Sequence, residues 1–199
     1  MNIIDDSWRR VTGGRARREE FFDLVCRYSD TARHYHNFEH IRDMLWNMYQ
    51  TDVREDCALH RAIWWHDAIY DSTRSDNEER SAELAAQTLS AWNEPSAEID
   101  RVVALILLTK RHDVPADDRV AETLIELDLR ILAAPTEKYD LYAVQVRAEY
   151  GWVSDGGYAR GRAEFLKRML ARVRIFTNPG LDASARANLT REYERLATS

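Results

Sequence analysis

Four ionisable residues of this chain follow an order that suits metal binding. His40 comes first, the adjacent pair His66 and Asp67 follows, and Asp128 stands some sixty positions further on. Neutral imidazole nitrogens and carboxylate oxygens are common ligands of divalent cations in proteins. The pattern therefore predicts a metal site that is assembled from three separate segments of the chain.

The surroundings of the two aspartates strengthen this prediction. Asp67 follows the apolar residues 63–65, and Asp128 stands between two leucines. A buried carboxylate costs several kcal/mol unless it is paired or coordinates a metal. Two imidazoles and two carboxylates neutralise a divalent cation and leave coordination positions for water and substrate. The predicted ligands are His40, His66, Asp67 and Asp128, and the candidate ions are manganese, nickel, cobalt, iron, magnesium and zinc.

The segments that carry these residues have apolar side chains at helical spacing. One stripe follows the i, i+3, i+4 pattern of an amphipathic helix: Ile41, Met44, Leu45 and Met48. Nothing alternates at period two over the length of a strand. A chain of 199 residues can fill one core. We therefore predict an all-α fold, a single-domain helical bundle spanning residues 1–199.

Composition narrows the function classes. The formal net charge is −6, which argues against a protein that binds long nucleic acids through their backbone. The longest apolar run, residues 102–108, is far shorter than the about 20 residues that span a membrane. The N-terminus does not read as a signal peptide, and the two cysteines lack metal-type spacing. These features predict a cytoplasmic protein without a membrane partner; a homodimer and a monomer both remain open.

The order of a histidine, a His-Asp pair and a distant aspartate resembles the HD-domain superfamily of metal-dependent phosphohydrolases. From about residue 8 onward, the chain is similar to a bacterial group of predicted phosphohydrolases within that superfamily. The segments that carry this resemblance are 33–37, 65–71, 76–82, 109–112, 128–132 and 147–150. The resemblance implies a bundle of the HD-domain type in which the four residues named above bind the metal ion.

Residues 35–40 are also similar to the Tyr-His-Asn-x-x-His segment of the cyclic-nucleotide phosphodiesterases. In those enzymes the second histidine binds metal and the first protonates the leaving group, which implies that His36 is a general acid beside His40. On one helix, this i, i+4 pair would share a face. Phosphodiesterases with two metal ions have a further histidine where this chain has Tyr70. A single ion is therefore the expectation.

Four other residues are candidates for substrate binding. His112 follows an apolar helix and is a candidate for a further ligand or a phosphate contact, and its alternative role is a favourable charge at a helix end. Lys110, two residues before it, has the same two interpretations. Glu78 is either a water-orienting acid or a favourable charge in a first helical turn. Arg147 is a candidate anion contact because arginine binds phosphate in a bidentate manner, and its alternative is a surface residue.

These residues together predict a metal-dependent phosphohydrolase that acts on a small phosphate ester or nucleotide. A bound cation would lower the pKa of water toward about 7. Asp67 would accept the proton of that water, and His36 would protonate the leaving oxygen. Two alternatives stay open: a di-iron oxygenase on the same fold, which would recruit His112 and further carboxylates, and a non-catalytic metal- or nucleotide-binding regulatory module.

Overall fold

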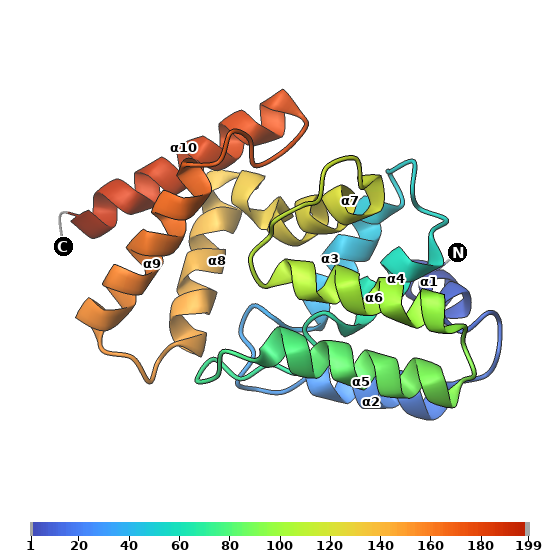
Figure 1. The fold of residues 1–199 in the computed structure, drawn as a ribbon. Coiled ribbons are helices and arrows are strands. Elements are labelled where there is room, and N and C mark those ends of the chain that lie inside the picture. The colour runs from blue at the N-terminus through green and yellow to red at the C-terminus, as the bar shows by residue number, and fades with distance from the viewer. Residues whose placement is uncertain (1, 198–199) are drawn as a thin grey trace. The chain divides into compact units, whose positions relative to one another are not determined.

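The computed structural model describes residues 2–197, and all regular secondary structure among them is helical (Figure 1). The predicted all-α class is confirmed, while membership of the HD-domain type stays a prediction. The chain divides into two compact units, Met1–Asp128 and Leu129–Ser199. A single domain over residues 1–199 also stays a prediction. None of the described helices is both long and apolar enough to cross a membrane.

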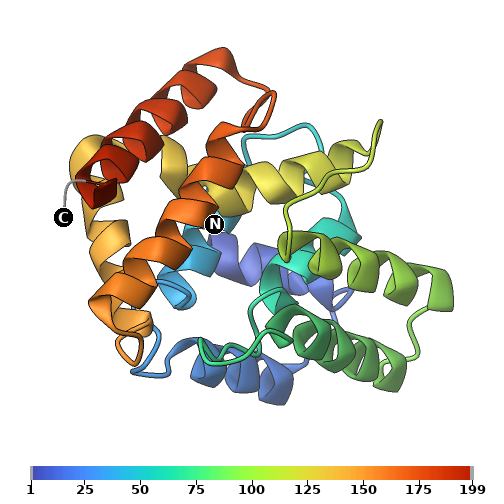
Figure 2. The same ribbon diagram turned by 60° about the vertical axis from the view of Figure 1, so that its left-hand side comes forward.

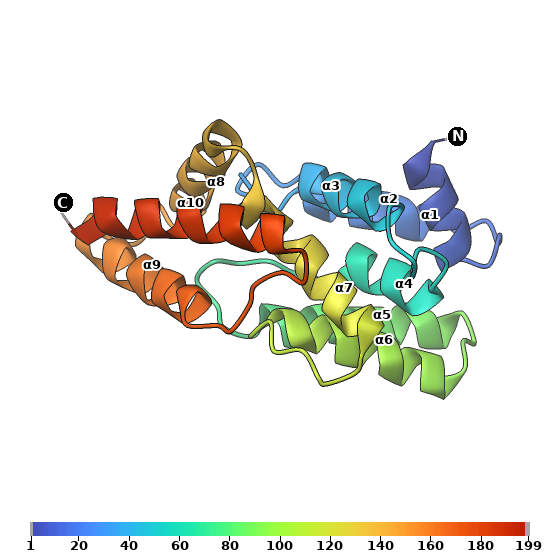
Figure 3. The same cartoon turned by 90° about the horizontal axis from the view of Figure 1, so that it is seen from above.

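Over the described residues 2–128, the first unit contains seven α-helices. In chain order they are α1 (Ile3–Val11), α2 (Arg18–Tyr28), α3 (Phe38–Met48), α4 (Cys57–Trp65), α5 (Asn77–Ala91), α6 (Ser96–Thr109) and α7 (Arg119–Asp128). Helix α4 is central, because it packs against α1, α3, α5, α6 and α7 (Figure 3). A helix that is enclosed in this way needs apolar residues all around. Its residues from Ala58 to Trp65 are all buried, and Trp64 and Trp65 are among the largest side chains of the core.

Three helices of this unit pack against one another pairwise: α3, α4 and α7. Helix α3 begins at Phe38 because the side chain of Asn37 accepts a hydrogen bond from the backbone N–H of Glu39 and caps the helix. Helix α4 ends at Trp65, and α7 ends at Asp128. This pairwise packing brings the start of α3 and the ends of α4 and α7 to one place, which is where the predicted metal ligands lie.

The polar side chains buried on α4 are matched by partners. Arg61 donates to the carbonyl of Val11 from both Nε and Nη2, and it pairs with Glu94 and Glu98. His60 donates from Nε2 to the carbonyl of Arg54 at 2.9 Å, and its Nδ1 atom accepts from the hydroxyl of Ser7 at 2.8 Å. These contacts fix α4 against α1 and against the loop that precedes α4, so the end of α4 that carries His66 has a rigid base.

The second unit contains the short 3₁₀ helix η1 (Leu129–Ala133) and three α-helices: α8 (Thr136–Glu149), α9 (Asp155–Leu170) and α10 (Pro179–Ala197). Helix α10 packs against α9 and η1 (Figure 2). Its buried Glu192 accepts two hydrogen bonds from Arg162 of α9, at 2.9 and 3.0 Å. The hydroxyl of Tyr139 also donates to Glu192. This fully paired carboxylate joins α8, α9 and α10 at the centre of the unit.

Candidate metal centre

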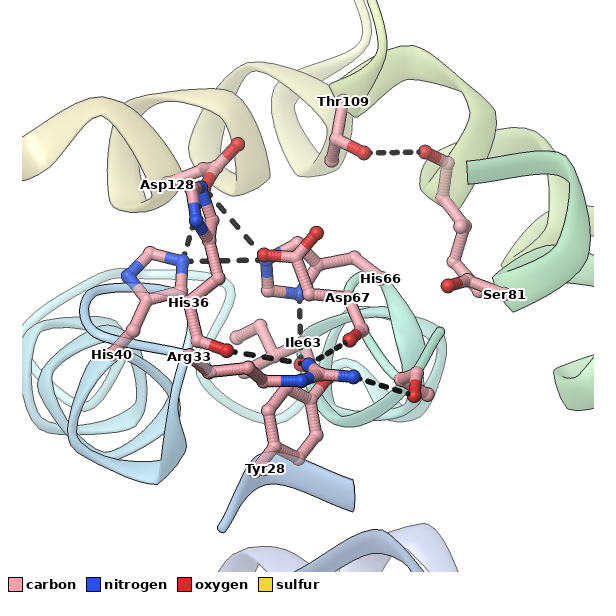
Figure 4. A network of polar contacts seen from close by, with 12 residues as sticks. Tyr28, Arg33, His36, His40, Ile63, His66, Asp67, Ser81, Thr109 and Asp128 are labelled. Carbon is pink, nitrogen blue, oxygen red and sulfur yellow. Dashed lines mark hydrogen bonds and ion pairs between the residues drawn. The ribbon is translucent and has the colours of Figure 1, made fainter. Parts of the chain in front are cut away.

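His40, His66 and Asp128 converge on one point in the first unit (Figure 4). One ligand atom from each of them lies within 4.8 Å of the other two. The Nε2 atom of His40 is 3.3 Å from Nε2 of His66 and 3.2 Å from Oδ1 of Asp128. The Nε2 atom of His66 is 3.7 Å from that same oxygen. Three of the four predicted ligands are therefore assembled, from the start of α3, the C-cap of α4 and the end of α7.

These separations fit a shared cation. Ligand atoms that each lie about 2.1 Å from one transition-metal ion are roughly 3.0–3.4 Å apart, and two of the three observed distances fall in that range. The Nδ1 atom of His66 is 3.0 Å from the carbonyl of Ile63. When Nδ1 donates to this carbonyl, the Nε2 lone pair faces the cluster, as a metal-binding histidine requires. The three residues could hold a metal ion.

The electrostatics of the cluster favour positive charge. Burial alone would lower the pKa of His66, but the carboxylates of Asp67 and Asp128 overcome this effect and raise the pKa to about 9. Burial would raise the pKa of Asp128, yet hydrogen bonds from His112 and His40 hold it well below its usual range. The site therefore keeps its carboxylates ionised and attracts a proton when no other cation compensates them.

Asp67, the fourth predicted ligand, lies beside this cluster but is not one of its three convergent members. Its Oδ2 atom is 3.2 Å from Nε2 of His66. Burial would raise the pKa of Asp67, while the charge and hydrogen bond of His66 lower it. The residue follows the C-cap of α4 in a turn, so its side chain is largely buried next to the ligands. Its role as a ligand stays a prediction.

The general-acid candidate His36 lies in the loop before α3, so the expectation of an i, i+4 pair on one helix is wrong. The two rings nevertheless meet, with centroids of His36 and His40 6.2 Å apart. The imidazole of His36 stacks on the ring of Tyr70 at 4.4 Å, which orients it. Tyr70 stands where phosphodiesterases with two metal ions have a further histidine, and here its ring holds the imidazole of His36 by stacking.

His112 reaches the cluster through Asp128. Its Nε2 atom is 3.2 Å from Oδ2, the oxygen of Asp128 that does not face His40. The residue follows α6 and adopts a left-handed backbone conformation with φ of 58°, which turns the chain out of the helix. His112 therefore orients the carboxylate of Asp128, and its own role as a metal ligand or phosphate contact stays a prediction.

The other three predicted substrate contacts are less closely tied to the cluster. Glu78 lies in the first turn of α5, where burial raises its pKa and the negative charge of Asp67 raises it further. Lys110 donates to the carbonyl of Ser75 at 2.6 Å and pairs with Glu79, so its ammonium group holds the start of α5. Arg147, in the second unit, binds the carbonyls of its own helix end and the following loop, together with Asp155.

One residue of the site had no predicted role. Arg33 is buried, and its guanidinium donates to the carbonyls of His36, Asp67 and Ala68 at 3.2, 2.6 and 3.1 Å (Figure 4). It also lies over the ring of Tyr28 at 5.2 Å. Arg33 therefore joins the backbone of the His36 loop to the backbone of the His-Asp turn. No spacing rule signals this role, because the carbonyl partners of an arginine can be any residue type.

Replacing Arg33 with Met is expected to lower the free energy of unfolding by about 3 kcal/mol, since a buried carbonyl without a donor costs about 1–3 kcal/mol. Urea denaturation measures this loss. Arg27→Met is the matched control, because Arg27 is a surface arginine that pairs with Asp23 and should change stability by no more than about 0.5 kcal/mol. Equal stability of the two variants would show that Arg33 does not hold the site together.

The raised pKa of His66 predicts how stability depends on pH in protein freed of metal with EDTA. An unfolded histidine has a pKa of about 6.5, and the folded value is about 9. The folded state therefore binds the extra proton, and its contribution to stability is complete below pH 6.5 and lost as pH rises through about 9. Urea denaturation between pH 6.5 and 9 should show falling stability, and His66→Gln should flatten the curve. A curve of unchanged slope in this variant would exclude His66 as the cause.

No family model matches the chain, and no match was found among curated proteins or among solved structures. What this centre can do chemically therefore follows from its own residues alone.

Proposed function

We propose that the chain is a metal-dependent phosphohydrolase that acts on a small phosphate ester or nucleotide. The observation that carries this proposal is the convergence of His40, His66 and Asp128 within 4.8 Å, in largely buried surroundings. Such a donor set holds a hydrolytic metal ion and leaves coordination positions free. The identity of the ion belongs to the proposal; manganese, nickel, cobalt, iron, magnesium and zinc are the candidates.

In this proposal His40, His66 and Asp128 hold the ion, and Asp67 and His36 move protons. A bound divalent cation supplies Lewis acidity, which makes water a nucleophile at neutral pH. Asp67 is suited to accept the proton of that water, because its carboxylate lies beside the three convergent residues, with Oδ2 3.2 Å from Nε2 of His66. His36 is suited to protonate the leaving oxygen, because its ring is oriented by Tyr70 and faces the same site.

The orientation of the ligands supports the same interpretation. The carbonyl of Ile63 fixes His66, and His112 fixes the second oxygen of Asp128. Partners of this kind set the tautomer and direction of metal ligands. Arg33 adds a third constraint, since it joins the segments that carry His36 and Asp67. We infer that the site is preorganised for chemistry, as electrostatic catalysis requires.

Hydrolysis of phosphoesters by the metal-loaded full chain tests the proposal. The chain is stripped with EDTA, reloaded separately with each candidate ion, and assayed on an aryl monoester, an aryl diester and a set of nucleotides. We expect phosphate or nucleotide product with at least one ion, and no product with the stripped chain. Confirmed metal binding without hydrolysis anywhere on the panel would refute the phosphohydrolase assignment. Iron retained on aerobic purification, with oxygen consumption instead, would favour the oxygenase.

A further inference from the structure

A groove on the first unit lies away from the metal ligands in sequence and uses none of them. It has a volume of about 390 Å³ and is formed by α1, the following loop and the start of α2. Pockets of roughly 300–1,000 Å³ accommodate small organic ligands. The residues that line it combine aromatic rings with arginines.

An aromatic row lines the groove. The rings of Trp8 and Phe21 meet edge to face at 5.3 Å between centroids, and Phe21 and Phe22 do so at 5.9 Å. Trp8 and Phe21 also pack on the core, but Phe22 is 62% exposed. An exposed aromatic ring beside a groove loses favourable burial unless something covers it. The row therefore offers a surface on which a planar apolar group can stack.

Two arginines whose guanidinium groups form no salt bridge within the described residues border this row. Arg9 and Arg18 line the groove, and among residues 2–197 neither guanidinium has a hydrogen-bond or salt-bridge partner, although the charge of Arg9 interacts with Asp6. Arg15 also lines it but is engaged, since it donates to two carbonyls and pairs with Glu94. One carboxylate, Asp5, is present as well. The free charges at the groove therefore sum to a net positive value, which favours an anion.

The backbone adds donors at the same place. Arg17 is the N-cap of α2, and its side chain makes no capping hydrogen bond to the first turn of the helix. The N–H groups at the start of a helix have no partner within the helix and carry a partial positive charge. Together with Arg18, which begins α2, they give an anion a second set of contacts.

We propose that this groove binds a small aromatic phosphate, such as a nucleoside monophosphate, at a site separate from the metal centre. The planar ring stacks on Phe22 and its aromatic neighbours, and the phosphate is held by Arg9 and Arg18. Guanidinium groups bind phosphate through charge-assisted hydrogen bonds, and aromatic side chains stack on nucleobases. The proposal does not depend on hydrolysis at the metal centre, because no residue is shared between the two sites.

Calorimetric titration of the full chain with AMP tests the proposal, in EDTA so that metal-mediated binding is absent. We expect one saturable site, with adenosine and inorganic phosphate each binding at least about tenfold more weakly, since each lacks one half of the contacts. Quenching of tryptophan fluorescence should accompany binding, because Trp8 lies in the aromatic row. Absence of saturable AMP binding overturns the proposal, and phosphate binding as tightly as AMP overturns the role of the rings.

Variants locate the site. The double variant R9Q/R18Q and the single variant Phe22→Ala should each raise the Kd for AMP by about tenfold or more. Arg54→Gln and Trp46→Ala are the matched controls, because both residues are exposed and lie outside the groove. Asp128→Asn should leave the Kd unchanged. Normal binding in R9Q/R18Q, or loss of binding in Asp128→Asn, would overturn the assignment to this groove.

Discussion

Replacing Asp128 with Asn is expected to weaken Mn²⁺ binding by at least about 100-fold. Loss of a residue that merely orients a metal ligand already costs about 10–100-fold in affinity, and Asp128 contributes a charged ligand atom. Asn has nearly the same shape, so the packing at the end of α7 is preserved. Isothermal titration calorimetry with the EDTA-stripped protein measures the change, and any metal-dependent hydrolysis should be lost with it.

The control for this prediction is His34→Ala, because His34 is an exposed histidine in the loop that carries His36. Its affinity for Mn²⁺ should equal that of the unmodified chain. Circular dichroism checks that Asp128→Asn remains helical. Mn²⁺ binding of unchanged strength in Asp128→Asn would mean that the ion binds elsewhere, and the proposed function would then lose its centre.

The helical class could be predicted because burial imposes a period on the sequence. Helix α3 shows this most clearly, since the predicted stripe of Ile41, Met44, Leu45 and Met48 is buried. The division at Asp128 could not be predicted in the same way. Asp128 ends α7 and Leu129 begins η1 without an intervening loop. No glycine, proline or charged run separates the two units at that point, so composition gives no signal.

The ligands could be predicted because burying a carboxylate is costly and demands a partner. That reasoning selected Asp128, which the structure brings together with His40 and His66, and Asp67, which lies beside them. The i, i+4 spacing of His36 and His40 misled for a different reason: Asn37 caps α3, so His36 lies before the helix and not on it. Neither pattern pointed to Arg33. Two of the three carbonyls that accept its hydrogen bonds, those of Asp67 and Ala68, stand 34 and 35 positions further along the chain. Contacts between a side chain and distant backbone atoms leave no pattern in the sequence.

The site therefore contains two kinds of residue. The residues that could hold a cation are restricted in chemical type, so their identities reveal them. The residues that fix the loops are restricted by geometry, and only the fold reveals them. Tyr70 belongs to the second kind. Its ring orients His36, whereas the sequence pattern indicated only that this position lacks a second-metal histidine. The proposed proton donor therefore depends on a neighbour that no ligand motif contains.

Replacing His36 with Ala is expected to reduce turnover of the hydrolysed substrate by about 10²–10⁴-fold, the usual contribution of general acid–base catalysis. Metal affinity should stay unchanged, because His36 is not one of the three convergent ligands. The loss should depend on the leaving group. An alkyl phosphate needs a proton on its leaving oxygen and should show the full loss. An aryl phosphate with a nitro group leaves without that proton and should show little.

This comparison of substrates distinguishes proton donation from a structural role for His36. A structural role would lower the rates for alkyl and nitroaryl phosphates by the same factor, because a displaced ligand or loop affects both alike. Proton donation lowers only the alkyl rate and removes the fall in that rate at alkaline pH, because a general acid acts only while it is protonated. Tyr70→Leu supplies an intermediate case, since it keeps His36 but removes the ring on which the imidazole stacks. If His36→Ala reduced both rates equally, His36 would be a positioning residue, and the leaving oxygen would need another proton source.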